Sequence, residues 1–491
     1  MYLYLSGHGY HFECENLCRV FYPYSRIVKT DIKENMPMGQ QALAGEPFAG
    51  AEISKSDDAY EYAVWISQDG RQLRKSECYK EDSEYLLTGM LFKLLCEFTA
   101  QQPQWGMLTG IHPVKLYREY FETEGEEAAD ERFGNEFFVS GRKLDLVKRA
   151  LEIQYPYIKA LTEKDFCLYV GIPFCPTKCS YCSFVSQSIE KTKKLIDPFF
   201  QRLLDEIKKT AEIVKTLGLS LISVYIGGGT PTTLSAEQLE KLCGEIHDDF
   251  DFSRCTEFTI EAGRPDTITA EKLLAMKRGG VSRISINPQS LSDKVLAAIG
   301  RLHTAADVKK AFDMAAKAGF ESINSDLIVG LPGDDLESFK ETLSGVLDMG
   351  ASNITVHALA LKRASEITGS GDYSSHSNQQ LANDMMDYAS QTLEEAGFSP
   401  YYMYRQSRMA GNLENIGWCK QNDVCAYNIY TMDESVSIIA CGAGGVTKLK
   451  APFDRRLERI FNFKYPHEYI NRHHEIIRRK EGVAKFYEQF R

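Results

Sequence analysis

Three cysteines in one short segment are the residues of this sequence best suited to chemistry. Cys175, Cys179 and Cys182 stand in GIPFCPTKCSYCSF, separated by three and then two residues. Thiolates at this spacing can hold three irons of a [4Fe–4S] cluster and leave the fourth iron open to a substrate. The alternative is a structural zinc site, which usually needs four protein ligands. The nearest further thiol, Cys167, stands in an apolar run typical of a core strand, so we favour the open cluster.

Alternating strands and helices must position this loop. Short apolar runs after residue 166 cover 167–172, 223–226, 256–260, 283–286, 322–329 and 353–357. Helical periodicity occupies the intervening segments, near 194–217, 235–248, 269–279, 291–299, 304–318 and 335–349. Apolar strands separated by helices predict βαβ units and a parallel sheet buried on both faces. We therefore expect an α/β fold, an incomplete (β/α)6 TIM-like barrel with an N-terminal α/β domain and a C-terminal α+β domain.

Unusual residues follow the predicted strands at one end. In parallel β/α barrels the carboxyl ends of the strands form the mouth where chemistry gathers. There the chain places the cysteine loop, then Gly228, Gly229 and Thr230, then Glu261, Gln289 and Asp326. Glycines after an apolar strand let the backbone approach a ligand closely, although a glycine run can also be a flexible turn. Taken alone, each acidic residue could equally cap a helix or pair with a cation.

Five segments in order carry a resemblance to a known family, the oxygen-independent coproporphyrinogen III oxidases among the radical S-adenosylmethionine (SAM) enzymes. They are LYVGIPFCPTKCSYC, YIGGGTPTTL, FTIEAGRPDTI, RISINPQSLSDKVLAAIGRLHT and SDLIVGLPGD. The resemblance implies a [4Fe–4S] cluster on the three cysteines and one or two SAM molecules. In that family the reduced cluster cleaves SAM to a 5′-deoxyadenosyl radical. The radical starts the oxidative decarboxylation of coproporphyrinogen III to protoporphyrinogen IX, with a low-potential electron donor such as flavodoxin or ferredoxin.

The resemblance also implies a set of SAM contacts. They are Tyr169, Tyr181, Gly228, Gly229, Thr230, Glu261, Gln289, Arg301 and Asp326. Arginine suits the methionine carboxylate, whereas carboxylate and amide groups suit the ribose hydroxyls. Tyr169 matches a family tyrosine near the sulfonium and Tyr181 one against the adenine, but either could equally be core packing.

Three positions depart from the family pattern. Phe184 stands where the oxidases have a further cysteine, Gly171 where they usually have histidine, and Asn287-Pro288 replaces Gly-Val before the glutamine. A sister group of haem chaperones also lacks that cysteine and binds haem through a motif that begins His-Asn. Here Gly411 precedes the asparagine. MAGNLENIGW, WGMLTGIHPVK and CGAGGVTKL instead resemble the bacterial coproporphyrinogen dehydrogenase paralogues. A haem-binding protein and a radical SAM enzyme with another substrate remain the alternatives.

Charge and composition limit the partners. The formal net charge is −11 with a pI near 5.6, which argues against general nucleic-acid binding. No apolar stretch is long enough to span a membrane and the start lacks a signal-peptide pattern, so we expect a cytoplasmic protein. A porphyrinogen substrate with four propionates needs local cations. The candidates, which could equally form a solvated charged face, are Lys362, Arg363, Arg405, Arg408 and Lys448.

The predicted domains are residues 1–160, of unknown role, then 161–365, the radical SAM barrel, and 366–491, a domain that covers the barrel mouth. In the first, the Asp-Gly of SQDGRQL predicts a hairpin after 60–66. Residues 10–12 are predicted as a strand and the acidic segment 124–136 as a loop. In the third, aromatic and β-branched residues at 426–431 read as a strand.

Overall fold

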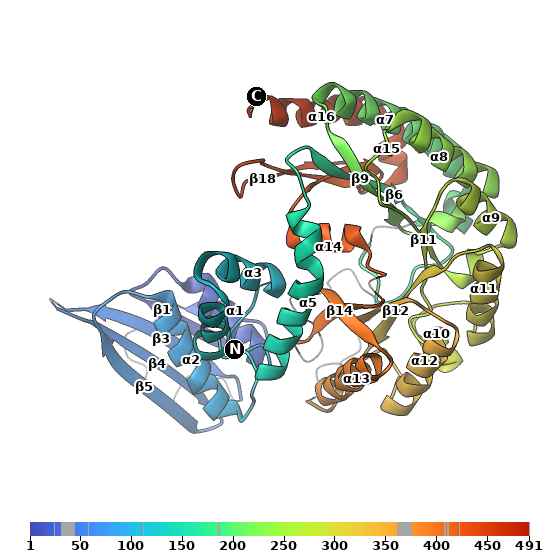
Figure 1. Cartoon of the computed structure of the whole chain (residues 1–491). Coiled ribbons are helices and arrows are strands. Elements are labelled where there is room, and N and C mark those ends of the chain that lie inside the picture. Colours follow the sequence, from blue (N-terminus) through green and yellow to red (C-terminus); the bar gives the residue numbers. More distant parts are fainter. Residues whose placement is uncertain are drawn as a thin grey trace. The chain divides into compact units, whose positions relative to one another are not determined.

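The protein is described from a computed structural model of the whole chain (Figure 1). The structure describes residues 1–490 except 24, 31–44, 57, 111, 185–186, 361–375, 407–408, 410–411 and 422, and it leaves out the side chains of 376 and 377. The chain forms two compact units, one of Met1–Lys148 with Arg405–Leu413 and one of Arg149–Tyr404 with Glu414–Arg491. The predicted boundaries at residues 160 and 365 stay predictions.

The first unit is built on a mixed sheet with the strand order β2-β1-β3-β4-β5. The strands are β1 (Tyr2–Ser6), β2 (Val28–Thr30), β3 (Phe48–Lys55), β4 (Tyr60–Gln68) and β5 (Arg71–Tyr79). The predicted hairpin is confirmed, because β4 and β5 pair antiparallel around Asp69 and Gly70, both with positive φ as a type I′ turn requires. Helices α1 (His11–Phe21) and α2 (Glu84–Thr99) pack together and bury an apolar core with the sheet.

Two sequence predictions for the first unit are wrong. Residues 10–12 belong not to a strand but to the start of α1, whose Cys14, Leu17, Cys18 and Phe21 are buried at helical spacing. The acidic segment is not a loop but helix α4 (Glu126–Glu131) followed by a π-helical turn (Arg132–Glu136). Lysine and arginine side chains pair with its carboxylates, so the repulsion that favours a loop is neutralised. Helices α3 (Pro113–Glu124) and α5 (Gly141–Lys159) flank it.

The second unit contains the predicted incomplete barrel (Figure 1). Its parallel strands are β6 (Asp165–Ile172), β9 (Ser220–Gly228), β10 (Glu257–Gly263), β11 (Arg283–Ile286), β12 (Ser322–Val329) and β13 (Asn353–Ala358). They neighbour one another in chain order, and the predicted helices between them are α7 (Ile196–Leu217), α8 (Ala236–Asp249), α9 (Ala270–Arg278), α10 (Asp293–Ala298), α11 (Ala305–Lys317) and α12 (Leu336–Asp348). The α/β fold class is confirmed.

C-terminal strands extend the same sheet at both edges. Beside β6 lie β16 (Ser437–Gly442), parallel to it, and the antiparallel β17 (Val446–Lys450) and β18 (Leu457–Phe461). Beside β13 lie β15 (Glu414–Lys420) and β14 (Phe398–Arg405). The shorter or later elements are α6 (Ile189–Thr192), α13 (His376–Glu395), α15 (Pro466–Asn471), α16 (His473–Glu488) and 3₁₀ turns at Lys193–Leu195, Pro231–Thr233 and Pro265–Thr267.

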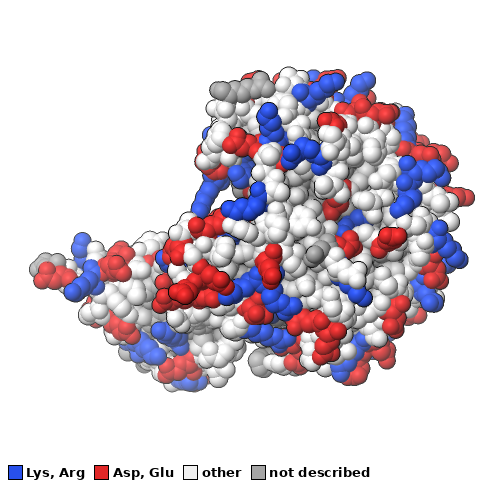
Figure 2. Space-filling model, viewed as in Figure 1, with Lys and Arg blue, Asp and Glu red and all other residues white. Residues whose placement is uncertain are grey.

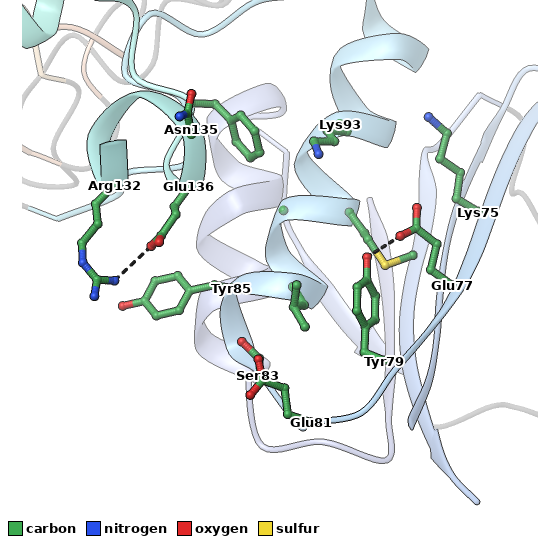
Figure 3. Close-up of a pocket in the computed structure, with 14 residues that line it drawn as sticks. Lys75, Glu77, Tyr79, Glu81, Ser83, Tyr85, Lys93, Arg132, Asn135 and Glu136 are labelled. Atoms are coloured by element: carbon green, nitrogen blue, oxygen red, sulfur yellow. Dashed lines mark hydrogen bonds and ion pairs between the residues drawn. The ribbon is translucent and has the colours of Figure 1, made fainter. Parts of the chain in front are cut away.

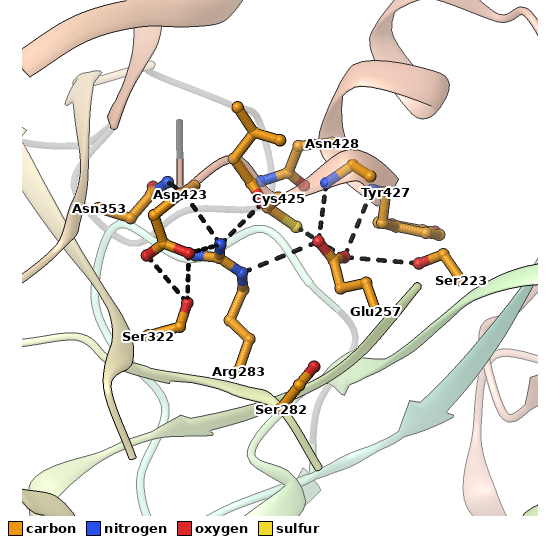
Figure 4. A network of polar contacts seen from close by, with 12 residues as sticks. Ser223, Glu257, Ser282, Arg283, Ser322, Asn353, Asp423, Cys425, Tyr427 and Asn428 are labelled. Carbon is orange, nitrogen blue, oxygen red and sulfur yellow. Dashed lines mark hydrogen bonds and ion pairs between the residues drawn. The ribbon is translucent and has the colours of Figure 1, made fainter. Parts of the chain in front are cut away.

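The strand predicted at 426–431 is wrong, because these residues form helix α14 (Ala426–Asp433). The carboxylate of Glu257, at the start of β10, accepts hydrogen bonds from the backbone nitrogens of Ala426 (2.7 Å) and Tyr427 (3.4 Å) (Figure 4). An acidic group at a helix N-terminus satisfies free N–H groups and stabilises the helix. Tertiary contacts have therefore overridden the strand preference of the aromatic residues.

No helix in the described ranges has the length and apolar content needed to cross a membrane. On the face of the molecule drawn in Figure 2, acidic and basic side chains are interspersed.

Candidate functional site

The cysteine loop leaves the carboxyl end of β6. Cys175 lies in the short strand β7 (Phe174–Cys175), which pairs with β8 (Gln187–Ser188). Cys179 is buried, Cys175 and Cys182 are half-buried, and the Cys182 amide donates to the Cys179 carbonyl at 3.0 Å. Burial raises the pKa of Cys182, and the neighbouring Cys179 and Cys175 raise it further. The three thiols therefore lie within electrostatic reach of one another.

This thiol set suits a cluster rather than a single ion. Among the residues that the structure describes, no three cysteine, histidine or acidic side chains converge as ligands of one metal ion. A [4Fe–4S] cluster does not need such convergence, because each thiolate binds a different iron. Three neighbouring thiols on one loop thus fit the cluster that the spacing predicts, and metal binding would release their protons.

The glycine run after β9 closes against this loop. The Gly229 and Thr230 amides donate to the carbonyls of Ile172 and Phe174, both at 2.7 Å, and the Thr230 hydroxyl lies 3.5 Å from Cys175 Sγ. A β carbon at Gly229 would lie 2.6 Å from the Phe174 carbonyl oxygen and 3.0 Å from Cys175 Sγ, so no other residue fits. The run is a close approach of two segments of the chain, and its predicted approach to a ligand stays a prediction.

Glu261 in β10 rests on a stack of tyrosines inside the barrel. The Tyr225 hydroxyl donates to Glu261 Oε1 at 2.6 Å, and the Tyr225 ring stacks on Tyr427 of α14 with centroids 4.5 Å apart. The ring centroids of Tyr169 and Tyr225 are 6.3 Å apart in the same stack. Burial, with the charge of Asp326, raises the pKa of Glu261 to about 7 despite the hydrogen bond from Tyr225. A buried carboxylate of this kind can accept hydrogen bonds from hydroxyl groups of a ligand.

Gln289 and Asp326 are held together between β11 and β12. The backbone N–H of Gln289 donates to the backbone carbonyl of Asp326 at 3.0 Å, and the backbone N–H of Asp326 donates to Asn287 Oδ1 at 3.2 Å. Gln289 has a φ of 68°, an uncommon conformation for a residue with a side chain. Burial by itself would raise the pKa of Asp326, but His357, 3.7 Å away, and Asn324, at 2.9 Å, outweigh it and lower the pKa.

Arg301 connects these strand ends to the cysteine loop. Its Nη1 donates to the Asn287 carbonyl at 2.6 Å and its Nη2 to the Tyr181 hydroxyl at 3.0 Å. Its buried Nε has no hydrogen-bond partner within the described part of the chain. Tyr181 packs against an apolar cluster formed by Val295, Leu296, Ile299, Ile328, Leu331 and Leu359. An unsatisfied guanidinium N–H beside an apolar wall fits a ligand with both a carboxylate and a flat ring.

The sequence did not single out Arg264, which contacts the cysteine loop, or its neighbour Asp266 and His303, which lies 3.9 Å from Asp266. Arg264 Nη1 lies 3.5 Å from Cys179 Sγ, and its fork binds Asp266. Burial and the charge of Arg301 lower the pKa of His303 to about 4, so its ring is neutral near pH 7. The available signal was the charged pair of AGRPD directly after Glu261, at the end of a predicted strand. Tyr427 was missed because its helix was predicted as a strand.

Of the five cations predicted to bind the substrate, the structure describes Arg405 and Lys448, and both have other partners. Arg405 is buried and donates to the carbonyls of Leu108 and Asn412 within the first unit. Lys448 pairs with Glu434 at 3.0 Å and lies opposite Ile438 near the start of β16, away from the carboxyl ends of the strands. Lys362, Arg363 and Arg408 lie outside the described residues.

A hollow of about 480 Å³ in the first unit offers less chemistry (Figure 3). It lies between β5, α2 and the π-helical turn, and many of its charges are paired. Arg132 binds Glu136 at 3.1 Å, Lys75 binds Glu97 at 2.7 Å, and the Tyr79 hydroxyl donates to Glu77. We therefore place the candidate site at the carboxyl ends of the barrel strands.

Comparisons with known proteins identify the family and the fold. Residues 169–345 match the sequence family described as the radical SAM superfamily. The chain is 34% identical over 398 residues to "Oxygen-independent coproporphyrinogen-III oxidase-like protein HemZ" of Bacillus subtilis (strain 168), which covers 80% of this chain and 79% of that protein. It is 38% identical over 195 residues to "Heme chaperone HemW" of the same organism, over 40% of this chain and 50% of that protein.

A solved structure shares the fold. Coproporphyrinogen III oxidase (HemN) from Escherichia coli, described as a radical SAM enzyme, superposes with a TM-score of 0.53 at 23% identity, over 65% of this chain and 71% of that chain.

Proposed function

Because this chain belongs to the radical SAM family of oxygen-independent coproporphyrinogen III oxidase-like proteins, we propose that it oxidatively decarboxylates coproporphyrinogen III to protoporphyrinogen IX. The observation that carries the substrate is the 34% identity over 80% of the chain. The chain of contacts from the cysteine loop through Arg301 and Asn287 to Asp326 supports a joint site for the cluster and SAM. The [4Fe–4S] cluster and SAM that this family uses supply one-electron reduction and the removal of an unactivated hydrogen.

The residues of the site have separate roles in this proposal. Cys175, Cys179 and Cys182 would hold the [4Fe–4S] cluster, and three protein ligands would leave it a position for SAM. The free Nε of Arg301 meets the methionine carboxylate, because a buried guanidinium N–H without a partner favours an anionic acceptor.

The remaining predicted contacts surround the same ligand. Glu261 and Asp326 would accept hydrogen bonds from the ribose hydroxyls, and Gln289 is held beside Asp326 by its backbone N–H. Gly228, Gly229 and Thr230 bring backbone groups to the amino group, since a side chain at Gly229 would collide with the cysteine loop. Tyr169 and Tyr181 present ring faces toward the sulfonium and the adenine.

The reaction requires an electron donor and an electron acceptor. Each of two propionates would lose a β hydrogen atom, which ends in 5′-deoxyadenosine derived from SAM, and would release carbon dioxide and one electron to become a vinyl group. An external acceptor takes that electron, and a low-potential carrier such as flavodoxin or ferredoxin reduces the cluster. We also propose a cytoplasmic location, because the three thiols bind iron only when reduced and cytosolic thiols are kept reduced.

A second candidate function is haem binding without turnover. Two observations favour it: the 38% identity to a haem chaperone, and Phe184 at the position where the oxidases carry a further cysteine. Phe184 is 67% exposed, so no thiol or buried group replaces that cysteine at this position.

Anaerobic cluster reconstitution followed by incubation with SAM, dithionite and coproporphyrinogen III tests both candidates. We expect 5′-deoxyadenosine and products in which vinyl groups replace propionates, measured by mass spectrometry. Cys179→Ser removes a cluster ligand and should abolish both products, whereas Cys78→Ser, an exposed cysteine of the first unit, should leave them unchanged. 5′-Deoxyadenosine without any vinyl product would refute the substrate, and stoichiometric haem uptake without conversion would favour the chaperone.

A further inference from the structure

Arg264 brings a guanidinium to the cysteine loop from the end of β10. Its side chain is 4% exposed. Nη1 lies 3.5 Å from Cys179 Sγ and 3.5 Å from the Thr177 carbonyl oxygen, and Nη2 donates to Thr177 Oγ1 at 3.1 Å. One side chain therefore contacts both a thiol and the backbone of the loop that carries it.

Asp266 fixes the orientation of this guanidinium. Arg264 Nε and Nη2 donate to the two carboxylate oxygens of Asp266 at 3.0 and 3.1 Å, a bidentate pair. The Arg264 amide and carbonyl are also held, by Ala262 at 2.7 Å and by the Thr267 hydroxyl at 2.8 Å. The pair with Asp266 partly neutralises the charge and leaves a directed N–H facing the sulfur.

The three thiols of the loop have different surroundings. Cys179 is approached by Arg264 and also by the guanidinium of Arg301. Cys175, by contrast, meets the neutral hydroxyl of Thr230 at 3.5 Å. Hydrogen bonds to ligand sulfurs and the local net charge are two of the terms that set the reduction potential of an iron–sulfur cluster. Cys179 thus has two guanidinium neighbours, and Arg301 also acts on Cys182.

We propose that Arg264 is a positioning residue that holds the cysteine loop and raises the reduction potential of the cluster bound there, and that Asp266 limits this effect. The inference rests on the proposed cluster at Cys175, Cys179 and Cys182. A stronger N–H donor to the Cys179 sulfur stabilises the added electron, because reduction increases the negative charge on the ligand sulfurs. Removal of Asp266 leaves the guanidinium charge uncompensated and strengthens the same effect.

Redox titration of the reconstituted full-length protein, followed by electron paramagnetic resonance without SAM or porphyrinogen, tests this. For Arg264→Gln we expect the equilibrium constant for reduction of the cluster to fall about tenfold. For a one-electron couple this corresponds to a reduction potential about 59 mV more negative. Asp266→Asn should shift the potential in the opposite direction, and Arg264→Lys should recover part of the wild-type value. Arg254→Gln, which breaks the remote pair with Asp165, should leave the potential unchanged.

Opposite shifts separate an electrostatic role from a structural one, because damage to the loop would move the potentials of both variants in one direction or lower their iron content. If Arg264→Gln loses the cluster, the potentials of Asp266→Asn and Arg264→Lys still test the inference. An unchanged or more negative potential for Asp266→Asn overturns it. If the wild-type protein takes up no cluster, the proposed function fails as well. A cluster with normal turnover and an unshifted potential in Arg264→Gln refutes the inference alone.

Discussion

The two ends of the barrel treat buried charge differently. At the amino ends of the strands, Arg283 Nη2 binds Asp423 Oδ1 at 2.5 Å and its Nε lies 3.8 Å from Glu257, which also anchors α14 (Figure 4). At the carboxyl ends, Arg264 is paired with Asp266, but Glu261 and Arg301 form no ion pair among the described residues. A buried guanidinium N–H without a partner in that part of the chain occurs at both ends, on Arg283 Nη1 and on Arg301 Nε. Unpaired buried charge is costly, so the first set stabilises the fold and the second is suited to a ligand.

The substitution with the largest expected effect disrupts the ion pairs of Arg283 with Glu257 and Asp423 at the amino ends of the strands. Arg283→Met leaves Glu257 and Asp423 without their shared cation, and loss of one partner of a buried ion pair costs about 3–5 kcal/mol. Urea unfolding should show this loss in the free energy of unfolding. A cost near zero would mean that the carboxylates are satisfied without Arg283 and that the contrast between the two ends is wrong.

Glu261 should make stability depend on pH. Its raised pKa of about 7, against 4.5 for the ordinary group, means that the folded state keeps a proton that the unfolded state has lost. The free energy of unfolding should therefore fall as pH rises from about 4.5 to 7, by about 3 kcal/mol in total for this residue. Glu261→Gln should remove that dependence in the ligand-free protein. The exposed Glu240→Gln is the control, and an identical pH profile for wild type and Glu261→Gln would contradict the assignment.

Arg301→Met should separate binding from stability. Loss of a charged hydrogen bond to SAM weakens binding by about 1.5–3 kcal/mol. The bonds of the same guanidinium to the Asn287 carbonyl and the Tyr181 hydroxyl are also charged, so their loss should lower the free energy of unfolding by about as much for each bond. Isothermal titration with SAM and urea unfolding of the same variant measure the two quantities. If Arg301→Met unfolds as easily as Arg283→Met while SAM affinity is kept, Arg301 is structural.

Tyr225→Phe should have the smallest effect. It removes the hydroxyl that donates to Glu261 at 2.6 Å but keeps the ring stacked on Tyr427. Since that hydrogen bond lowers the pKa of Glu261, the midpoint of the pH dependence should move upward, with a change of about 1 kcal/mol. Comparison with Glu261→Gln checks this, because the shift must vanish in the double variant.

Much of the barrel could be predicted from the sequence, and its tertiary pairs could not. The six strands follow from apolar runs separated by segments of helical periodicity. The cysteine loop and the glycine run are recognisable from their residue types. Helix α14 was missed because its start is stabilised by Glu257, which lies far away in the chain. The contacts of Arg264 with Cys179 and of Tyr225 with Glu261 also join separate segments, and residue spacing carries no information on such register.

The parallel pairing of β6 with β16 has a consequence for the order of folding. Ser437–Gly442 covers the edge of Asp165–Ile172, although most of the barrel is synthesised between them. At ~5–20 residues per second, a nascent chain keeps that edge of β6 uncovered for tens of seconds. Unpaired strand edges invite association with other chains, so chaperone protection during translation matters most before Ser437 emerges. A stop codon ahead of this strand would leave the cysteine-bearing strand permanently open on one side.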